Sequence, residues 1–191
     1  MIENQDEERI IKSVQEGDYH SFEALIDDYQ KPIFKTINGM VADYEVAKDL
    51  TQDTFFRALD KIDQFQFRSK FSTWLFRIAY NITKAYLIKN SNKARLAEKY
   101  RTDDKTYTSD ENGVDGTEDL RLIYQALDQV DPQYKGALIL HAINNIPYEE
   151  IALIIDVPIG TVKSRIYRGK KQMIELLPDC IKESYMSPQQ K

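Results

Sequence analysis

The chain of 191 residues contains one cysteine, two histidines and a single tryptophan. Cys180 alone cannot form an internal disulfide, and with only His20 and His141 beside it a closed zinc site of Cys and His ligands cannot be completed. No segment is apolar enough to span a membrane, and the acidic N-terminal residues do not resemble a signal peptide. We therefore expect a soluble protein of the reducing cytoplasm, without a metal or other cofactor.

Glycine is also scarce, with seven residues. No glycine-rich loop of the kind that cradles phosphates is present. Two isolated histidines and one cysteine form no recognisable catalytic constellation. An enzyme is therefore the least favoured class of function.

The charges are segregated along the chain. The net charge of −5 by itself argues against nucleic-acid binding. Basic residues, however, dominate from 57 to 101, and they recur from 158 to 174, where no acid interrupts them. Acidic residues dominate the first thirty residues and the stretch 103–119. Two basic regions separated by acidic chain are the pattern expected of two nucleic-acid contacts on one polypeptide.

Apolar residues recur with helical rather than strand spacing. The periodicity predicts helices over about 22–41, 43–62, 72–89, 120–130, 134–144, 148–155 and 158–177, with Ser69 or Ser72 as the cap of the third. Residues 90–117 lose this periodicity and gather polar residues, which indicates a flexible linker. The expected fold is all-α, with two small helical domains at 1–89 and 118–181 and a C-terminal tail at 182–191.

The stretch YEEIALIIDVPIGTVKSRIYR, residues 148–168, has the spacing of a DNA-binding helix-turn-helix. Small Ala152 suits the close approach of two helices. Asp156 occupies the turn, where Gly or Asn would adopt the left-handed conformation more easily. Hydroxyl and basic residues suited to base edges and phosphates lie outside the apolar stripe: Thr161, Lys163, Ser164, Arg165 and Arg168. The alternative is a helical hairpin whose basic face is only solvated.

The helix expected at 43–62 has an apolar side and an opposite side on which Phe56 lies among polar residues. These neighbours are Asp49, Gln52 and Asp53. An exposed aromatic residue ringed by polar groups suits a protein partner. Packing of Phe56 against a neighbouring helix is the alternative at this point.

The stretch FSTWLFRIAYNI, residues 71–82, contains the only tryptophan. Trp74 shares a face with Leu75 and Ile78, so we expect it to anchor the core rather than to stack on a ligand. The other face carries Thr73, Arg77, Tyr80, Asn81 and Lys84. The preceding loop, residues 63–70, adds Phe65, Phe67, Arg68 and Lys70. Cations, an amide and aromatic rings in this combination can hold a splayed single-stranded base and its phosphates.

These motifs, in this order, resemble those of a bacterial sigma factor of the extracytoplasmic-function (ECF) group. DLTQDTFFRALDKIDQF resembles the segment that docks on core RNA polymerase, and FSTWLFRIAYNITKAYL resembles the promoter-melting helix. IPYEEIALIIDVPIGTVKSRIYRGKKQM resembles the reader of the upstream element. The resemblance covers nearly the whole chain. It implies two helical domains, sigma regions 2 and 4, in a protein that directs promoter-specific initiation, often in stress responses, without itself being a catalyst.

The resemblance also implies a role for each surface. Asp49, Gln52, Asp53 and Phe56 would meet the coiled coil of the polymerase clamp. The loop 63–70 and the outer face with Arg77, Tyr80, Asn81 and Lys84 would read a flipped base of the minus-ten element and hold the displaced strand. The five helix-turn-helix residues would read the minus-thirty-five element, and other parts of that domain would engage the polymerase flap. An anti-sigma factor, often membrane-bound in this group, is implied as a further partner.

Two rival classes use only part of these features. A one-component repressor or activator would share the helix-turn-helix, but it needs a dimer interface and leaves the face around Phe56 unexplained. An RNA-binding or antitermination protein fits the basic stripe near Arg77 and leaves the helix-turn-helix unexplained.

Overall fold

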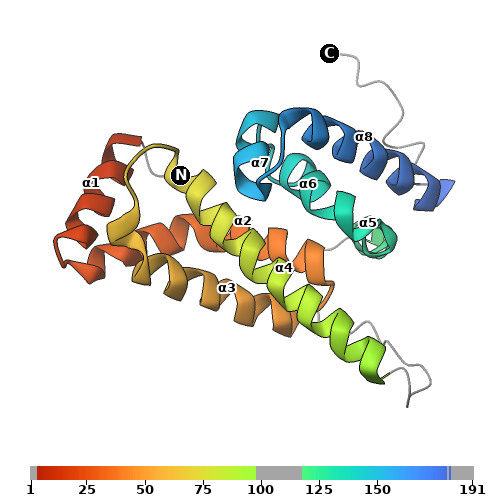
Figure 1. Cartoon of the computed structure of the whole chain (residues 1–191), viewed down its shortest axis with the longest axis horizontal. Coiled ribbons are helices and arrows are strands. Elements are labelled where there is room, and N and C mark those ends of the chain that lie inside the picture. Colours follow the sequence, from red (N-terminus) through yellow and green to blue (C-terminus); the bar gives the residue numbers. More distant parts are fainter. Residues whose placement is uncertain (1–3, 98–117, 180, 182–191) are drawn as a thin grey trace.

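The computed structural model describes residues 4–97, 118–179 and 181. All regular secondary structure in these residues is helical, which confirms the expected all-α class (Figure 1). The N-terminal helices are α1 (Asn4–Gln15), α2 (Phe22–Val41), α3 (Tyr44–Asp60) and α4 (Phe71–Ala97), with short 3-10 helices at Tyr19–Ser21 and Ile62–Gln64. The C-terminal helices are α5 (Glu118–Gln129), α6 (Pro132–Ala142), α7 (Tyr148–Ile155) and α8 (Ile159–Leu176).

The observed helix bounds differ from the expected ones in three places. Helix α1 was not expected, and it packs through the buried side chains of Ile11 and Val14. Helix α4 continues to Ala97, so residues 90–97 of the expected linker are helical, and the rest of that linker lies outside the described residues. Ser72 lies inside the first turn of α4 rather than capping it.

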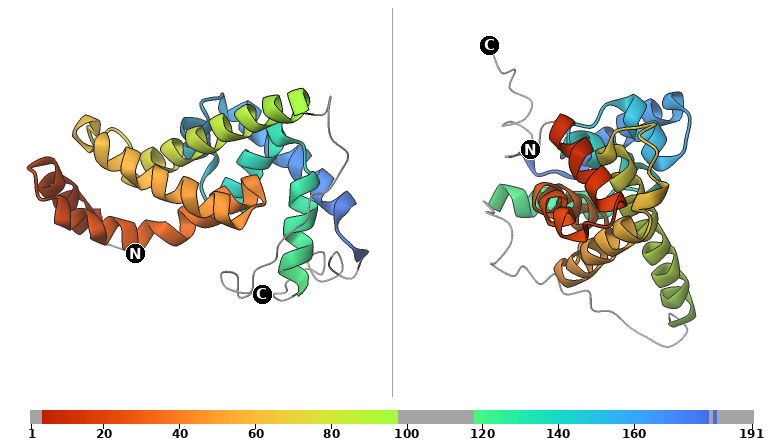
Figure 2. Two further views of the ribbon diagram at one scale, coloured as in Figure 1. Left: turned by 90° about the horizontal axis from the view of Figure 1, so that it is seen from below. Right: turned by 90° about the vertical axis from the view of Figure 1, so that its left-hand side faces the viewer.

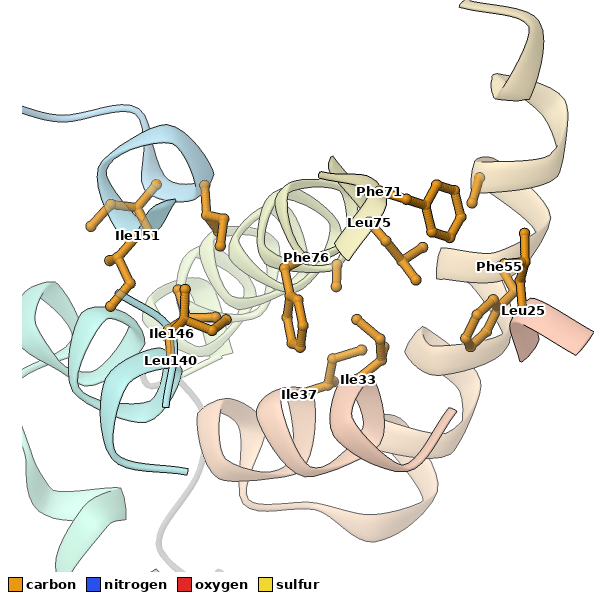
Figure 3. Close-up of a cluster of buried hydrophobic side chains, with 14 of the residues drawn as sticks. Leu25, Ile33, Ile37, Phe55, Phe71, Leu75, Phe76, Leu140, Ile146 and Ile151 are labelled. Carbon is orange, nitrogen blue, oxygen red and sulfur yellow. The ribbon is translucent and has the colours of Figure 1, made fainter. Parts of the chain in front are cut away.

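Helices α2, α3 and α4 pack around an aliphatic and aromatic core (Figure 3). Helix α3 begins at Asp43, whose side chain accepts a hydrogen bond of 3.0 Å from the backbone N–H of Val46. The hydroxyls of three buried threonines donate to carbonyls four residues earlier in the same helix, so these polar groups are satisfied inside the core: Thr51, Thr54 and Thr83.

Helices α5, α6, α7 and α8 form the C-terminal half, with α7 and α8 as the helix-turn-helix. Helix α6 starts where Asp131 caps it and Pro132 occupies its first turn. Gly169 of α8 permits close packing on α6, because a β-carbon there would lie 3.3 Å from Leu138 and Tyr134. Asp156 ends α7 with φ of 56°, so it adopts the left-handed conformation that the turn requires.

The two halves pack directly against each other, with α7 on α4 and α6 on α2 (Figures 1 and 2). Figure 3 shows Leu140 and Ile146 of the C-terminal half near Phe76 of α4, all in one buried cluster. The amide of Asn144 donates to the hydroxyl of Thr36 at 2.8 Å. No helix in the described part of the chain is long and apolar enough to cross a membrane.

Candidate nucleic-acid interface

The face around Phe56 on α3 is open to solvent. The side chain of Phe56 is 72% exposed. Asp49, Gln52 and Asp53 beside it are also exposed. The adjacent Phe55, by contrast, is buried against Phe22, with ring centroids 6.4 Å apart. The alternative that Phe56 packs on a neighbouring helix is therefore wrong, and this face is available to a partner.

The loop 63–70 presents fewer side chains than expected. Phe65 is only 5% exposed, and its ring lies 5.7 Å from that of Phe71 and 5.3 Å from that of Trp74. The expectation that Phe65 contacts nucleic acid is thus wrong for this structure, because the ring completes the aromatic core. Trp74 is half-buried in the same cluster, which fits its expected role as an anchor. Phe67 and Arg68 remain exposed.

Helix α1 holds this loop in place. The side-chain amide of Gln15 donates to the backbone carbonyls of Ile62, at 2.7 Å, and Phe65, at 3.0 Å. The ammonium of Lys12 lies 5.6 Å from the ring centroid of Phe67. Sequence reasoning missed this support. The helical spacing of Ile11 and Val14 within the first fifteen residues was the signal that could have revealed it.

The outer face of α4 is divided between solvent and the C-terminal half. Arg77, Asn81 and Lys84 are exposed. Thr73 and Tyr80 were expected on the same open face, yet Thr73 is 4% exposed and Tyr80 is half-buried. Both are covered because α6 and α7 pack on α4. Burial raises the pKa of Tyr80, and the nearby positive charge of Arg165 opposes this rise.

Asn81 lines a hollow of about 180 Å³ between α3 and α4. The other lining residues are Arg57, Lys61, Ile78, Ile82 and Ala85. The cations Arg57 of α3 and Lys61, the residue directly after α3, were not among the expected contact residues. Arg57 and Lys61 are distant from Asn81 in sequence, and the packing of α3 against α4 brings all three residues to the same hollow.

The basic face of the helix-turn-helix lies on α8. Lys163, Ser164 and Arg168 are exposed, whereas Thr161 and Arg165 are half-buried. The Ser164 hydroxyl donates to the Thr161 carbonyl at 2.9 Å. The guanidinium of Arg168 donates to the Tyr134 hydroxyl at 3.3 Å. The apolar stripe of the same helix, with Val162 and Ile166, is buried, so the cations and hydroxyls lie on the side away from the domain core.

The described residues contain no group of three or more His, Cys, Asp and Glu side chains placed to hold a metal ion. The side chains exposed on these surfaces offer charges, amides, hydroxyls and aromatic rings. Such groups bind nucleic acid and protein partners.

Two family models match the chain. "Sigma-70 region 2" matches residues 25–92, and "Sigma-70, region 4" matches residues 120–173. These matches cover the helices that carry the exposed Phe56 face, the α4 face and the helix-turn-helix. The fold and its surfaces define a transcription initiation factor of the sigma type.

Relatives match over nearly the full length. The chain is 33% identical to the ECF RNA polymerase sigma factor SigW of Bacillus subtilis, over 88% of this chain and 95% of that protein. It is 30% identical to the RNA polymerase sigma-H factor of Pseudomonas aeruginosa, over 96% of this chain and 100% of that protein. The solved structure of the sigma factor RpoE from Bartonella quintana, in complex with the anti-sigma factor NepR, matches with a TM-score of 0.69 at 25% identity, covering 81% of this chain and 95% of that one.

The chain belongs to the family of ECF RNA polymerase sigma factors. As a sigma factor, it binds core RNA polymerase and directs promoter-specific initiation of transcription. The rival classes of a one-component regulator and an RNA-binding protein are thereby set aside.

Proposed function

We propose that the chain performs the sigma function through three separate surfaces. The first is the polymerase surface on α3, made of Asp49, Gln52, Asp53 and Phe56. The second is the minus-ten surface, made of Phe67, Arg68, Lys70, Arg77, Tyr80, Asn81 and Lys84. The third is the minus-thirty-five surface on α8, made of Thr161, Lys163, Ser164, Arg165 and Arg168. In this proposal the region 2 domain ends with α4, and the region 4 domain covers 118–181.

The observation that carries this assignment is the exposure of Phe56 beside the burial of Phe55. A 72% exposed aromatic ring among two carboxylates and an amide offers an apolar centre with an acidic rim. Such a centre contributes strongly to binding once a partner removes it from water. A basic helical partner such as the clamp coiled coil fits this chemistry, and the polymerase flap would engage the region 4 domain.

The minus-ten surface is proposed to act by capture rather than by catalysis. A flipped base would lie by the loop 63–70 and Asn81, while cations on α4 hold the backbone of the displaced strand. Because this surface binds the unpaired strand in preference to duplex, binding shifts the promoter toward the open state. No bond is made or broken by the chain itself.

Control by an anti-sigma factor is a further part of the proposal. Its support is the similarity to RpoE, whose structure was solved with the anti-sigma factor NepR. A membrane-bound regulator of this kind would link the chain to the membrane without direct insertion. The proposed compartment is the cytoplasm, because core polymerase acts there.

The test is run-off transcription with purified bacterial core RNA polymerase and a library of randomised promoters. We expect transcripts only when the full chain is added, and we expect the selected templates to share two sequence elements. Heat-denatured chain serves as the control. If no template yields a transcript that depends on the chain, the proposal is wrong.

A further inference from the structure

The carboxylate of Glu150 in α7 is held by two groups at the start of α4. The ammonium of Lys70 lies 2.6 Å from its Oε1, and the hydroxyl of Thr73 donates to its Oε2 at 2.9 Å. These partners are 80 and 77 residues away in sequence. Each carboxylate oxygen therefore has its own donor from the other half of the molecule.

The donors form a small built anion site. Thr73 is 4% exposed, so its hydroxyl is fixed by packing, and Lys70 reaches the same carboxylate from the solvent side. The site also lies at the first turn of a long helix, where the helix dipole favours a negative group. An ammonium and a hydroxyl that converge on two oxygens of one anion are donors that proteins commonly use for nucleic-acid phosphates.

A second cation of the minus-ten surface lies one turn further along α4. One turn beyond Thr73, Arg77 lines a hollow of about 440 Å³ together with Asp156 of the helix-turn-helix. Lys70 of the minus-ten surface thus contacts an acid of the C-terminal half directly, and Arg77 lines the same hollow as a second acid, Asp156. The C-terminal half thus places the carboxylate of Glu150 on this surface, while the positive charge of Arg165 lies near Tyr80.

We propose that Lys70 and Thr73 form a binding site for a backbone phosphate of the single-stranded promoter element, and that Glu150 occupies this site in the free chain. The inference rests on the proposed function and adds Thr73 and Glu150 to it. Glu150 and a phosphate need the same two donor atoms, so they exclude each other. The strand binds only when the C-terminal half has moved away from the start of α4.

This exclusion lowers the affinity of the free chain for a single strand. The apparent affinity falls in proportion to the fraction of molecules whose site is open. Removing the charge of Glu150 weakens its hold on Lys70 and raises that fraction. For a partly exposed ion pair, we expect Glu150→Gln to tighten strand binding by about threefold to tenfold.

The test measures the binding of the full-length chain to a fluorescent single-stranded oligodeoxynucleotide of randomised sequence, by anisotropy at fixed low salt. The matched control is Glu149→Gln, which removes the same charge from the neighbouring exposed position of α7. We expect Glu150→Gln to bind several-fold more tightly than the wild type and Glu149→Gln to stay within about twofold of it. Because both variants change the net charge equally, the difference in affinity between them reports the contact of Glu150 with Lys70 and Thr73. Circular dichroism confirms that each variant is folded.

A second pair of variants locates the site. In the Glu150→Gln background, Thr73→Val keeps the shape of the side chain and removes the hydroxyl, so the gain in affinity should disappear. Lys70→Gln in the same background should also remove it and should reduce the slope of log affinity against log salt by about 0.7, the share of one phosphate contact on a single strand.

Three results would overturn the inference. One is equal affinity of Glu150→Gln and Glu149→Gln. Another is a gain in Glu150→Gln that survives both Thr73→Val and Lys70→Gln. The third is no binding by Glu150→Gln up to about 100 μM, the weak end of non-specific affinities. If one of these results is found and the wild-type chain still supports run-off transcription, only the phosphate site is wrong. If the expected binding results are found but the chain supports no transcription, only the proposed function is wrong.

Discussion

The α-carbon of Gly136 lies against the ring of Tyr80, so close that a β-carbon on it would come within 2.7 Å of Tyr80 Cε2. Gly136 belongs to α6 in the C-terminal half, and Tyr80 belongs to the α4 face that we assign to the promoter strand. A residue without a side chain therefore lets the two halves meet over the minus-ten surface.

Gly136→Ala should loosen the contact between the halves. The added methyl group meets the half-buried Tyr80 ring, while within α6 alanine is a better helix former than glycine by about 1 kcal/mol. The radius of gyration from small-angle X-ray scattering should therefore increase, with helix content unchanged. Gly160→Ala is the control, because nothing lies within 4 Å of a β-carbon at that helical position. A radius of gyration of Gly136→Ala equal to that of the wild type would contradict the prediction.

The contact between the halves should weaken at high pH. Burial raises the pKa of Tyr80, so the packed arrangement favours the neutral phenol. The neutral phenol of Tyr80 stabilises the contact between the halves fully at pH values below the ordinary tyrosine pKa of about 10. This stabilisation is lost as the pH rises through the higher pKa of the packed state. Carbon-13 NMR of labelled tyrosine rings, with Tyr80→Phe for assignment, should show a lower pKa for Tyr80 in Gly136→Ala than in the wild type. Equal midpoints in the two proteins would count against burial by α6.

Phe55 and Phe56 are neighbours whose replacement should separate stability from binding. Phe56→Ala removes a 72% exposed ring, so the free energy of unfolding should change by no more than about 0.5 kcal/mol. Its affinity for core polymerase should fall by about 10-fold to 100-fold. Phe55→Ala removes a 7% exposed ring and should lower the free energy of unfolding by about 3 kcal/mol or more. Urea denaturation and polymerase binding measure the two effects, and wild-type affinity in Phe56→Ala would rule out the polymerase surface.

Local patterns in the sequence were enough to predict most helices, the exposed face around Phe56 on α3 and the basic face of the helix-turn-helix on α8. The period of the apolar residues correctly predicted α2, α3 and the helix-turn-helix, and the position of Phe56 opposite the apolar side of α3 correctly predicted its exposure. The burial of Thr73 and Tyr80 was not predictable in this way, because it comes from α6 and α7, which pack on α4 from a distant part of the chain. Phe65 is buried for a different reason: the loop turns its ring back onto Phe71 and Trp74 of α4, and the sequence pattern of the loop did not show this turn.

Asn81 and Arg165 should affect different steps of promoter binding. Arg165→Ala should weaken binding of holoenzyme to duplex DNA containing the upstream element by about 10-fold, the usual scale of a lost base or phosphate contact in the major groove. Asn81→Ala should leave that binding nearly unchanged and slow strand opening, because its amide faces the hollow between α3 and α4. Filter binding to an upstream duplex and permanganate reactivity of unpaired thymines distinguish the steps. Equal effects of both changes on the upstream duplex would refute this division.

The central claim is that the C-terminal half covers part of the minus-ten surface in the free chain, at Tyr80 and Lys70, and leaves it in the working complex. Fluorescence energy transfer between dyes on Lys89→Cys of α4 and Glu149→Cys of α7, in a Cys180→Ser background, measures this directly, since both positions are exposed. We expect efficient transfer in the free chain and a large decrease when core RNA polymerase and promoter DNA are added. Equal transfer in the free chain and in the complete initiation complex would contradict the account.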